Sequence, residues 1–321
     1  SQNSWSSVGH CQTISAGISD AGVIKMISRL NARLGESELW LDFRASLSAQ
    51  IGAFIMVVFT LGALFAPLIS PQDPYDLTAI NILDAYQPSW LFGEGDRQFL
   101  LGTDAQGRDI LSAILYGTRV SIFVGVMGVL LAATIGVSLG LLAGYFGWFV
   151  DNLIMRIADI ELSFPSILIA LFIMFFWEPG IRNIIVAIAA VEWVLYARTA
   201  RASVLSEREK DYIDASKAIG LPVHKIMFRH VLPNIMAPII VIVNVRFAWV
   251  IILEASLSFL GAGVPAERPS LGRLILNGYE MLFSGYWWTS VFPGIALVLM
   301  VFGVNLLGDW LRDALNPRLT K

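Results

Sequence analysis

Three charged residues lie within otherwise apolar stretches of the sequence: Glu192, Arg246 and Glu254. A charge at the centre of a bilayer costs about 2.5–3.5 kcal/mol on insertion scales, so we expect these residues to face other helices or a water-filled path. Arg246 and Glu254 are separated by about 12 Å of helical rise and about 80° of rotation, too far for a direct pair. The three could contact the charged ends of a passing solute. Alternatively, they form interhelical ion pairs or polar contacts between subunits.

A charged amphipathic segment, residues 205–238, separates two strongly apolar stretches. Four of its residues recur at i, i+3, i+4 and i+7, the spacing of one helix face. They are Tyr212, Ala215, Ser216 and Ile219. Gly220 and Pro222 are expected to end this helix. A short helix joined at both ends to apolar helices can transmit a push from a soluble partner into them. The alternative is an ordinary juxtamembrane loop whose Lys and Arg residues serve topology alone.

The sequence does not indicate a metal or nucleotide site. The chain has one cysteine, Cys11, and three histidines, of which His224 and His230 lie in the charged segment, so we expect no zinc site. A P-loop requires the sequence Gly-Lys-Ser/Thr, and none of the five lysines follows a glycine. We therefore expect no catalytic residue, metal or cofactor on this chain. ATP and Mg²⁺, where they are used, would bind separate subunits.

The composition indicates an integral membrane protein. Of the 321 residues, 56% are hydrophobic and 15% charged, against about 25% charged in soluble domains, and the mean hydropathy is +0.68. A membrane-spanning helix needs about 20 apolar residues. We predict an all-α protein with six transmembrane helices, located within residues 50–69, 119–151, 158–177, 183–200, 235–260 and 280–309.

Small residues recur along the second predicted span. The glycines are Gly125, Gly128, Gly136, Gly140 and Gly144, and from Gly128 on, with Ala132 included, the small residues recur at four-residue steps. Small residues at this spacing allow two helices to approach closely. We interpret the stripe as a packing surface, with a translocation path as the alternative.

The polar segments divide the chain into four regions. Residues 1–45 are expected to form a cytoplasmic tail and, from Val23, an interfacial amphipathic helix, without a cleavable signal peptide. Residues 46–118 would hold the first span and a periplasmic loop, in which a hydrophilic excursion covers 70–118. Residues 119–310 would form the transmembrane core, with the charged loop at 201–234 and a further loop at 261–287. Residues 311–321 would be a cytoplasmic tail.

The distribution of Lys and Arg predicts the orientation. Most of the basic residues near the predicted spans fall on segments that share a side with both termini, including the charged loop. Basic residues favour the cytoplasmic side of a membrane. Both termini and the charged loop are therefore expected in the cytoplasm.

The charged loop resembles the coupling-loop signature of ATP-binding-cassette importer permeases, Glu-Ala-Ala, three residues, Gly, nine residues, Ile, one residue, Leu-Pro. The matching residues are Asp214, Ala215, Ser216, Gly220, Leu232 and Pro233. Asp replaces Glu, Ser replaces the second Ala, and His230 takes the Ile position. By this resemblance Tyr212, Asp214, Ala215, Ser216, Ile219 and Gly220 would couple the chain to an ATPase.

The resemblance extends over most of residues 45–319. Its segments are LLGTDAQGRDILSAILYGTRVS (100–121), LLAGYFGWFVDNLIMRIADIELSFPSIL (141–168), RHVLPN (229–234), ILEASLSFLGAGV (252–264) and NLLGDWLRDALNPRL (305–319). These are similar to the C-type permease subunit of dipeptide, oligopeptide and nickel importers. The resemblance implies a type I importer bundle with a cytoplasmic coupling helix, in a bacterial inner membrane.

The same resemblance implies partners and a function. The partners would be a homologous second permease, two ATPase subunits, an external substrate-binding protein and membrane lipids, with no nucleic acid. The expected function is ATP-driven import of di- or oligopeptides or peptide-like solutes. Import of nickel chelates or other small solutes is an alternative. An ion-coupled secondary transporter would need intramembrane acids and usually an internal repeat. A membrane enzyme would need clustered polar residues at one face.

Overall fold

The computed structural model describes residues 40–76, 78, 80–92, 98–265 and 268–315. Two compact units are distinguished, Ser1–Ala45 and Ser46–Lys321. In the first unit, residues 40–45 are helical, and the ring of Trp40 stacks on that of Phe43 with centroids 5.8 Å apart. The interfacial helix predicted from Val23 lies outside the described residues.

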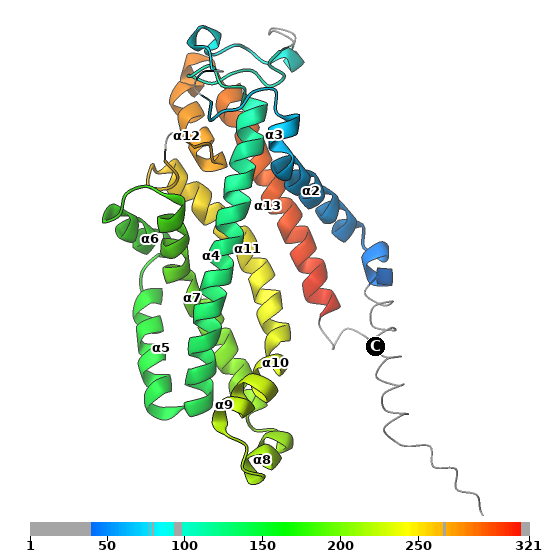
Figure 1. Cartoon of the computed structure of the whole chain (residues 1–321), viewed down its shortest axis with the longest axis vertical. Coiled ribbons are helices and arrows are strands. Elements are labelled where there is room, and N and C mark those ends of the chain that lie inside the picture. Colours follow the sequence, from blue (N-terminus) through cyan, green and yellow to red (C-terminus); the bar gives the residue numbers. More distant parts are fainter. Residues whose placement is uncertain (1–39, 77, 79, 93–97, 266–267, 316–321) are drawn as a thin grey trace, which may run out of the picture. The chain divides into compact units, whose positions relative to one another are not determined.

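The second unit is a bundle of long apolar helices (Figure 1). Within the described part of the chain, five helices are long and apolar enough to cross a membrane. They are α2 (Leu47–Leu64), α4 (Ile110–Phe146), α7 (Ile181–Glu207), α11 (Met236–Phe259) and α13 (Trp288–Ala314). The remaining described elements are short helices and turns, with one isolated bridge between Thr103 and Asp109. The predicted all-α membrane fold is confirmed.

The predicted span at 158–177 is not one continuous helix. The chain forms α5 (Trp148–Leu162) and α6 (Ser166–Phe175), which meet at an angle of 90°. Pro165 lies at the break in an extended conformation. Proline has no N–H for the helical ladder, and it disfavours helical geometry in the residue before it. If the bent pair is one span, the bundle has six.

Two predicted polar segments are also more helical than expected. The hydrophilic excursion, expected over 70–118, ends earlier because α4 begins at Ile110, where the Asp109 side chain accepts a hydrogen bond from the Ser112 N–H. The charge of Arg119, which suggested the later boundary, lies on an exposed position of this helix. The predicted loop at 261–287 contains a further helix, α12 (Leu271–Met281), which the Ser270 side chain caps at Arg273 N–H.

Shorter helices complete the described chain. They are α3 (Ala66–Ile69), η1 (Ile82–Asp84), η2 (Trp90–Phe92), α8 (Asp211–Ala218), α9 (Val223–Lys225), η3 (Ile226–Val231), α10 (Leu232–Asn234) and η4 (Leu282–Ser284). In Figure 1, α8 lies at one end of the bundle, and the segment before α4 lies with α12 at the other end. The bundle therefore has one end made by the charged loop and one made by the described part of residues 70–109.

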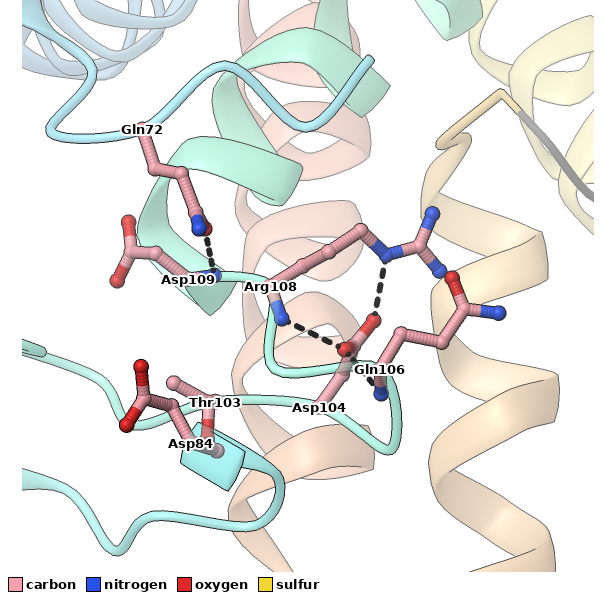
Figure 2. Close-up of polar contacts among 7 residues, drawn as sticks. All are labelled: Gln72, Asp84, Thr103, Asp104, Gln106, Arg108 and Asp109. Carbon is pink, nitrogen blue, oxygen red and sulfur yellow. Dashed lines mark hydrogen bonds and ion pairs between the residues drawn. The ribbon is translucent and has the colours of Figure 1, made fainter. Parts of the chain in front are cut away.

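A buried ion pair organises the segment before α4 (Figure 2). Asp104 accepts hydrogen bonds from the Arg108 N–H at 3.0 Å and from its Nε at 2.9 Å. Gln72 Oε1 accepts from the Asp109 N–H at 2.8 Å, and Thr103 Oγ1 donates to the Asp84 carbonyl at 2.5 Å. These contacts fix the chain on both sides of Tyr75 to the start of α4.

The glycine stripe of α4 is a packing surface. A Cβ added to Gly140 would lie 2.8 Å from Ala200 Cβ, and one added to Gly144 would lie 2.7 Å from Val204 Cβ, both on α7. Gly136 faces Tyr196 of the same helix in the same way. Any side chain there would push α4 and α7 apart. This confirms the packing interpretation over the translocation path.

Candidate functional site: the charged loop and the ion pair of the bundle

One face of α8 anchors it to the bundle. Ile213 and Ser216 are its buried residues. The Ile213 side chain belongs to a hydrophobic cluster with Leu141 of α4 and Val204 of α7. Ser216 Oγ donates to the Tyr212 carbonyl at 2.7 Å, so its hydroxyl is satisfied within the helix. The sequence pattern missed Ile213, because a single isoleucine among charged residues gives no periodic signal.

Tyr212 links the two sides of the loop. Its hydroxyl donates to the Glu207 carboxylate at the end of α7 and accepts from Asn234 Nδ2 of α10 at 3.0 Å. Asn234 Nδ2 also donates to the His230 carbonyl at 2.6 Å. Burial and the hydrogen bond to Glu207 raise the pKa of Tyr212 to about 12, so the hydroxyl stays a neutral donor at physiological pH.

Gly220 ends α8 as predicted. Its φ is +77°, its N–H bonds the Lys217 carbonyl at 3.0 Å, and the Leu221 N–H bonds the Ser216 carbonyl at 3.2 Å. This is the glycine-terminated helix end in which the residue after the helix is left-handed. Any other L-residue would pay about 1–2 kcal/mol for that conformation. Pro222 then precedes α9, as expected.

The rest of the predicted face points outward. The side chain of Ile219 is 76% exposed and that of Tyr212 37%, and Ala215 is exposed as well. On the same surface Asp214 pairs with Lys217 at 2.8 Å. The structure thus separates the predicted residues into a buried member, Ser216, and an exposed apolar and charged surface.

Arginines of α7 and the turn after it connect the charged loop to neighbouring helices. Arg208 donates to the Gly144 carbonyl at 3.0 Å, near the C-terminal end of α4, where a cation is favourable. Arg201 forms a two-bond ion pair with Asp151 of α5, and Arg198 lies 2.5 Å from Asp159. A displacement of α8 would therefore be transmitted to α4, α5 and α7.

The structure brings Glu192 and Arg246 together. Arg246 Nε and one terminal nitrogen each donate to the Glu192 carboxylate at 2.8 Å, and Trp249 Nε1 donates to it at 3.1 Å. The Arg246 guanidinium also lies 5.5 Å from the centre of the Trp249 ring. The Glu192 side chain is 1% exposed and that of Arg246 is 21% exposed. This is an interhelical ion pair between α7 and α11.

Glu254 is separate from that pair. Its carboxylate accepts from Ser121 Oγ of α4 at 2.7 Å and from Ser258 Oγ at 2.8 Å, and the residue is fully buried. Of the three intramembrane charges, only Arg246 has appreciable exposed surface. The prediction of contact with a solute now concerns Arg246, while Glu192 and Glu254 join helices.

Comparison with known proteins assigns the chain to a family. Residues 136–321 match the family described as binding-protein-dependent transport system inner membrane component. The chain belongs to this family. Residues 37–88 also match the N-terminal transmembrane domain of oligopeptide transport permease C. The chain is thus a multi-pass permease of the inner membrane, whose transport system includes an ATPase and a binding protein. A secondary transporter and a membrane enzyme are excluded.

Individual relatives cover nearly the whole chain. The dipeptide transport system permease protein DppC of Haemophilus influenzae is 38% identical over 282 residues, 88% of this chain and 94% of the relative. The oligopeptide transport system permease protein OppC of Bacillus subtilis is 36% identical over 302 residues, 94% of this chain and 95% of the relative. The inward-facing MetNI methionine ABC transporter has 19% identity and a TM-score of 0.52 over 64% of this chain and 96% of that chain, which shows a shared fold.

Proposed function

We propose that this permease imports di- or oligopeptides, or peptide-like solutes, with energy from two separate ATPase subunits. The names of its relatives support a peptide substrate. A second, similar permease would complete the path, and the external binding protein would deliver solute to the end formed by residues 70–109. Membrane lipids would cover the exposed apolar side chains of the outer helix faces.

The observation that carries the proposal is the arrangement of α8. Ile213 fixes the helix to the bundle while Ile219 and Ala215 face outward, and Tyr212 ties it to both flanking helices. A soluble subunit that binds the exposed surface of α8 would therefore move α7 and α10 together. We infer that α8 and both termini lie in the cytoplasm, which agrees with the excess of Lys and Arg on these segments.

Ile219 provides the sharpest test of this coupling role. Ile219→Glu places a charge where an apolar contact with the ATPase would form, so we expect at least about a tenfold loss of bound ATPase, as unpaired charges are costly to bury. Ile82→Glu is the matched control, because Ile82 is 78% exposed at the other end of the bundle. The ATPase recovered with the purified permease and ATP-driven uptake into proteoliposomes are measured for both.

Each outcome of this experiment bears on the proposal. Loss of ATPase and of uptake in Ile219→Glu, with ATPase recovery retained in Ile82→Glu, supports it. Full ATPase recovery with normal uptake in Ile219→Glu would refute the coupling role. Peptide uptake is tested in the same vesicles with a labelled tripeptide and its binding protein, and its absence from a complex that hydrolyses ATP would refute the substrate class.

A further inference from the structure

A cavity opens at the end of the bundle opposite α8. Tyr75, Tyr116, Arg119, Phe123 and Arg268 are among the residues that line it, and its volume is about 510 Å³. A second cavity, of about 800 Å³, shares Phe123 and Arg268 with the first and continues along α4 and α7. The two form one groove with a polar mouth and an apolar floor, the latter including Met127 and Leu130.

Three arginines line this groove, Arg119 in the first cavity, Arg182 in the second and Arg268 in both. Arg119 of α4, Arg182 of α7 and Arg268 of the α11–α12 connection, here called the mouth cluster, all line it and are all exposed. Among the described residues, no carboxylate lies within ion-pair distance of any of them. The nearby Asp73 accepts the Tyr75 N–H at 2.9 Å. The mouth therefore has more positive charge than the described chain neutralises.

Two tyrosines stand beside this charge. The rings of Tyr75 and Tyr116 meet edge to face with centroids 5.2 Å apart. Burial raises the pKa of the Tyr75 hydroxyl, and the charges of Arg268 and Arg119 oppose that rise, so both guanidinium groups act on it. A neutral hydroxyl near two guanidinium groups can form a donor set for an anion with them, since arginine binds carboxylates through paired N–H groups.

We infer that the mouth cluster receives the C-terminal carboxylate of the incoming peptide, with the peptide's side chains against the apolar groove. This inference rests on the proposed peptide import and adds an orientation to it. A cationic cluster attracts anions and raises their local concentration. A carboxylate attached to apolar groups matches both halves of the groove. An anionic lipid headgroup has related chemistry and is distinguished by the test.

The test compares a free-acid tripeptide with its C-terminal amide in proteoliposomes that contain the complete transporter and its binding protein. The variants are Arg119→Gln and Arg268→Gln, with Arg119→Lys to keep the charge and Arg156→Gln as an exposed basic control on α5 outside the groove. The ratio of free-acid uptake to amide uptake is measured for each. Because the binding protein is unchanged, its own preference cancels between variants.

We expect each Gln variant to lower this ratio about two- to fivefold, as for a partly exposed ion pair, through an increase in KM for the free acid. Arg119→Lys should recover part of it, and Arg156→Gln should leave it unchanged. Equal effects on acid and amide would overturn the inference, and so would an effect that follows the anionic lipid content of the vesicles. In either case ATP-driven peptide uptake by the unaltered transporter would persist, so the proposed function would stand.

Discussion

The Glu192–Arg246 pair makes a quantitative and asymmetric prediction. Arg246→Gln leaves Glu192, 1% exposed, with Trp249 as its remaining donor, and an uncompensated buried charge costs about 3–5 kcal/mol. Glu192→Gln leaves Arg246, which is 21% exposed and lies beside the Trp249 ring, so water can solvate it and the cost should be nearer the 1–3 kcal/mol of a lost charged hydrogen bond. The double variant should recover about 2 kcal/mol of the summed cost.

These costs can be measured by unfolding the purified permease in mixed micelles at increasing SDS fraction, followed by tryptophan fluorescence. The expected order of stability is wild type, Glu192→Gln, then Arg246→Gln, with the double variant above the sum of the singles. Additive costs, or a larger cost for Glu192→Gln, would refute the reasoning. Uptake by the double variant separates a purely structural role of the pair from a role in transport: regained stability without regained uptake indicates that transport itself needs Arg246 or the pair.

Two further predictions concern α4 and its packing. Gly140→Ala should destabilise the bundle by about 1–3 kcal/mol through its contact with Ala200. Gly294→Ala, with open space around it, should be neutral or stabilising by up to about 1 kcal/mol. Thermal unfolding in detergent measures the change in stability for each variant, and changes of the same sign would contradict the packing interpretation. Burial raises the pKa of Asp109 despite its hydrogen bonds to Ser112. The folded state therefore binds this proton more tightly than the unfolded state does, and the stability that protonation contributes is lost as pH rises through the folded pKa. Asp109→Asn, which still caps the helix, should therefore match or exceed wild type in melting temperature at pH 7, with the difference shrinking at lower pH; a less stable Asn variant at pH 7 would contradict this.

The long elements could be predicted from the sequence because the bilayer imposes a length and a composition on them. The end of α8 was equally accessible, since Gly220 adopts a φ of +77° that glycine tolerates best. Apolar content alone predicts neither the break at Pro165 nor the start of α4 at Ile110. Asp109 as N-cap and Pro165 as breaker were both readable signals.

The pairing of charges could not be predicted, because it depends on how helices distant in sequence pack. Arg246 pairs with Glu192, which is 54 positions away in the sequence, and not with Glu254 of its own helix. Glu254 in turn accepts a hydrogen bond from Ser121 of α4. Sequence spacing gave the rise and rotation along one helix but nothing about its neighbours. Ile213 was missed for a related reason, since its burial depends on Leu141 and Val204.

The charged loop is joined to α7 and, through α10, to α11, the two helices that carry the Glu192–Arg246 pair, so the proposed coupling would reach the membrane interior. On α7, Glu207 binds Tyr212 and Glu192 lies about 22 Å further along the helix. On the other side, Asn234 binds Tyr212 and the chain continues through α11 to Arg246. A displacement of α8 therefore acts on both helices between α8 and the two-bond contact of Glu192 with Arg246. If α7 and α11 separate at the α8 end, they must either pivot about this pair or break it. If the helices pivot about the pair, uptake by the double variant should stay low even when its stability recovers. If the pair must break, uptake by the double variant should be faster.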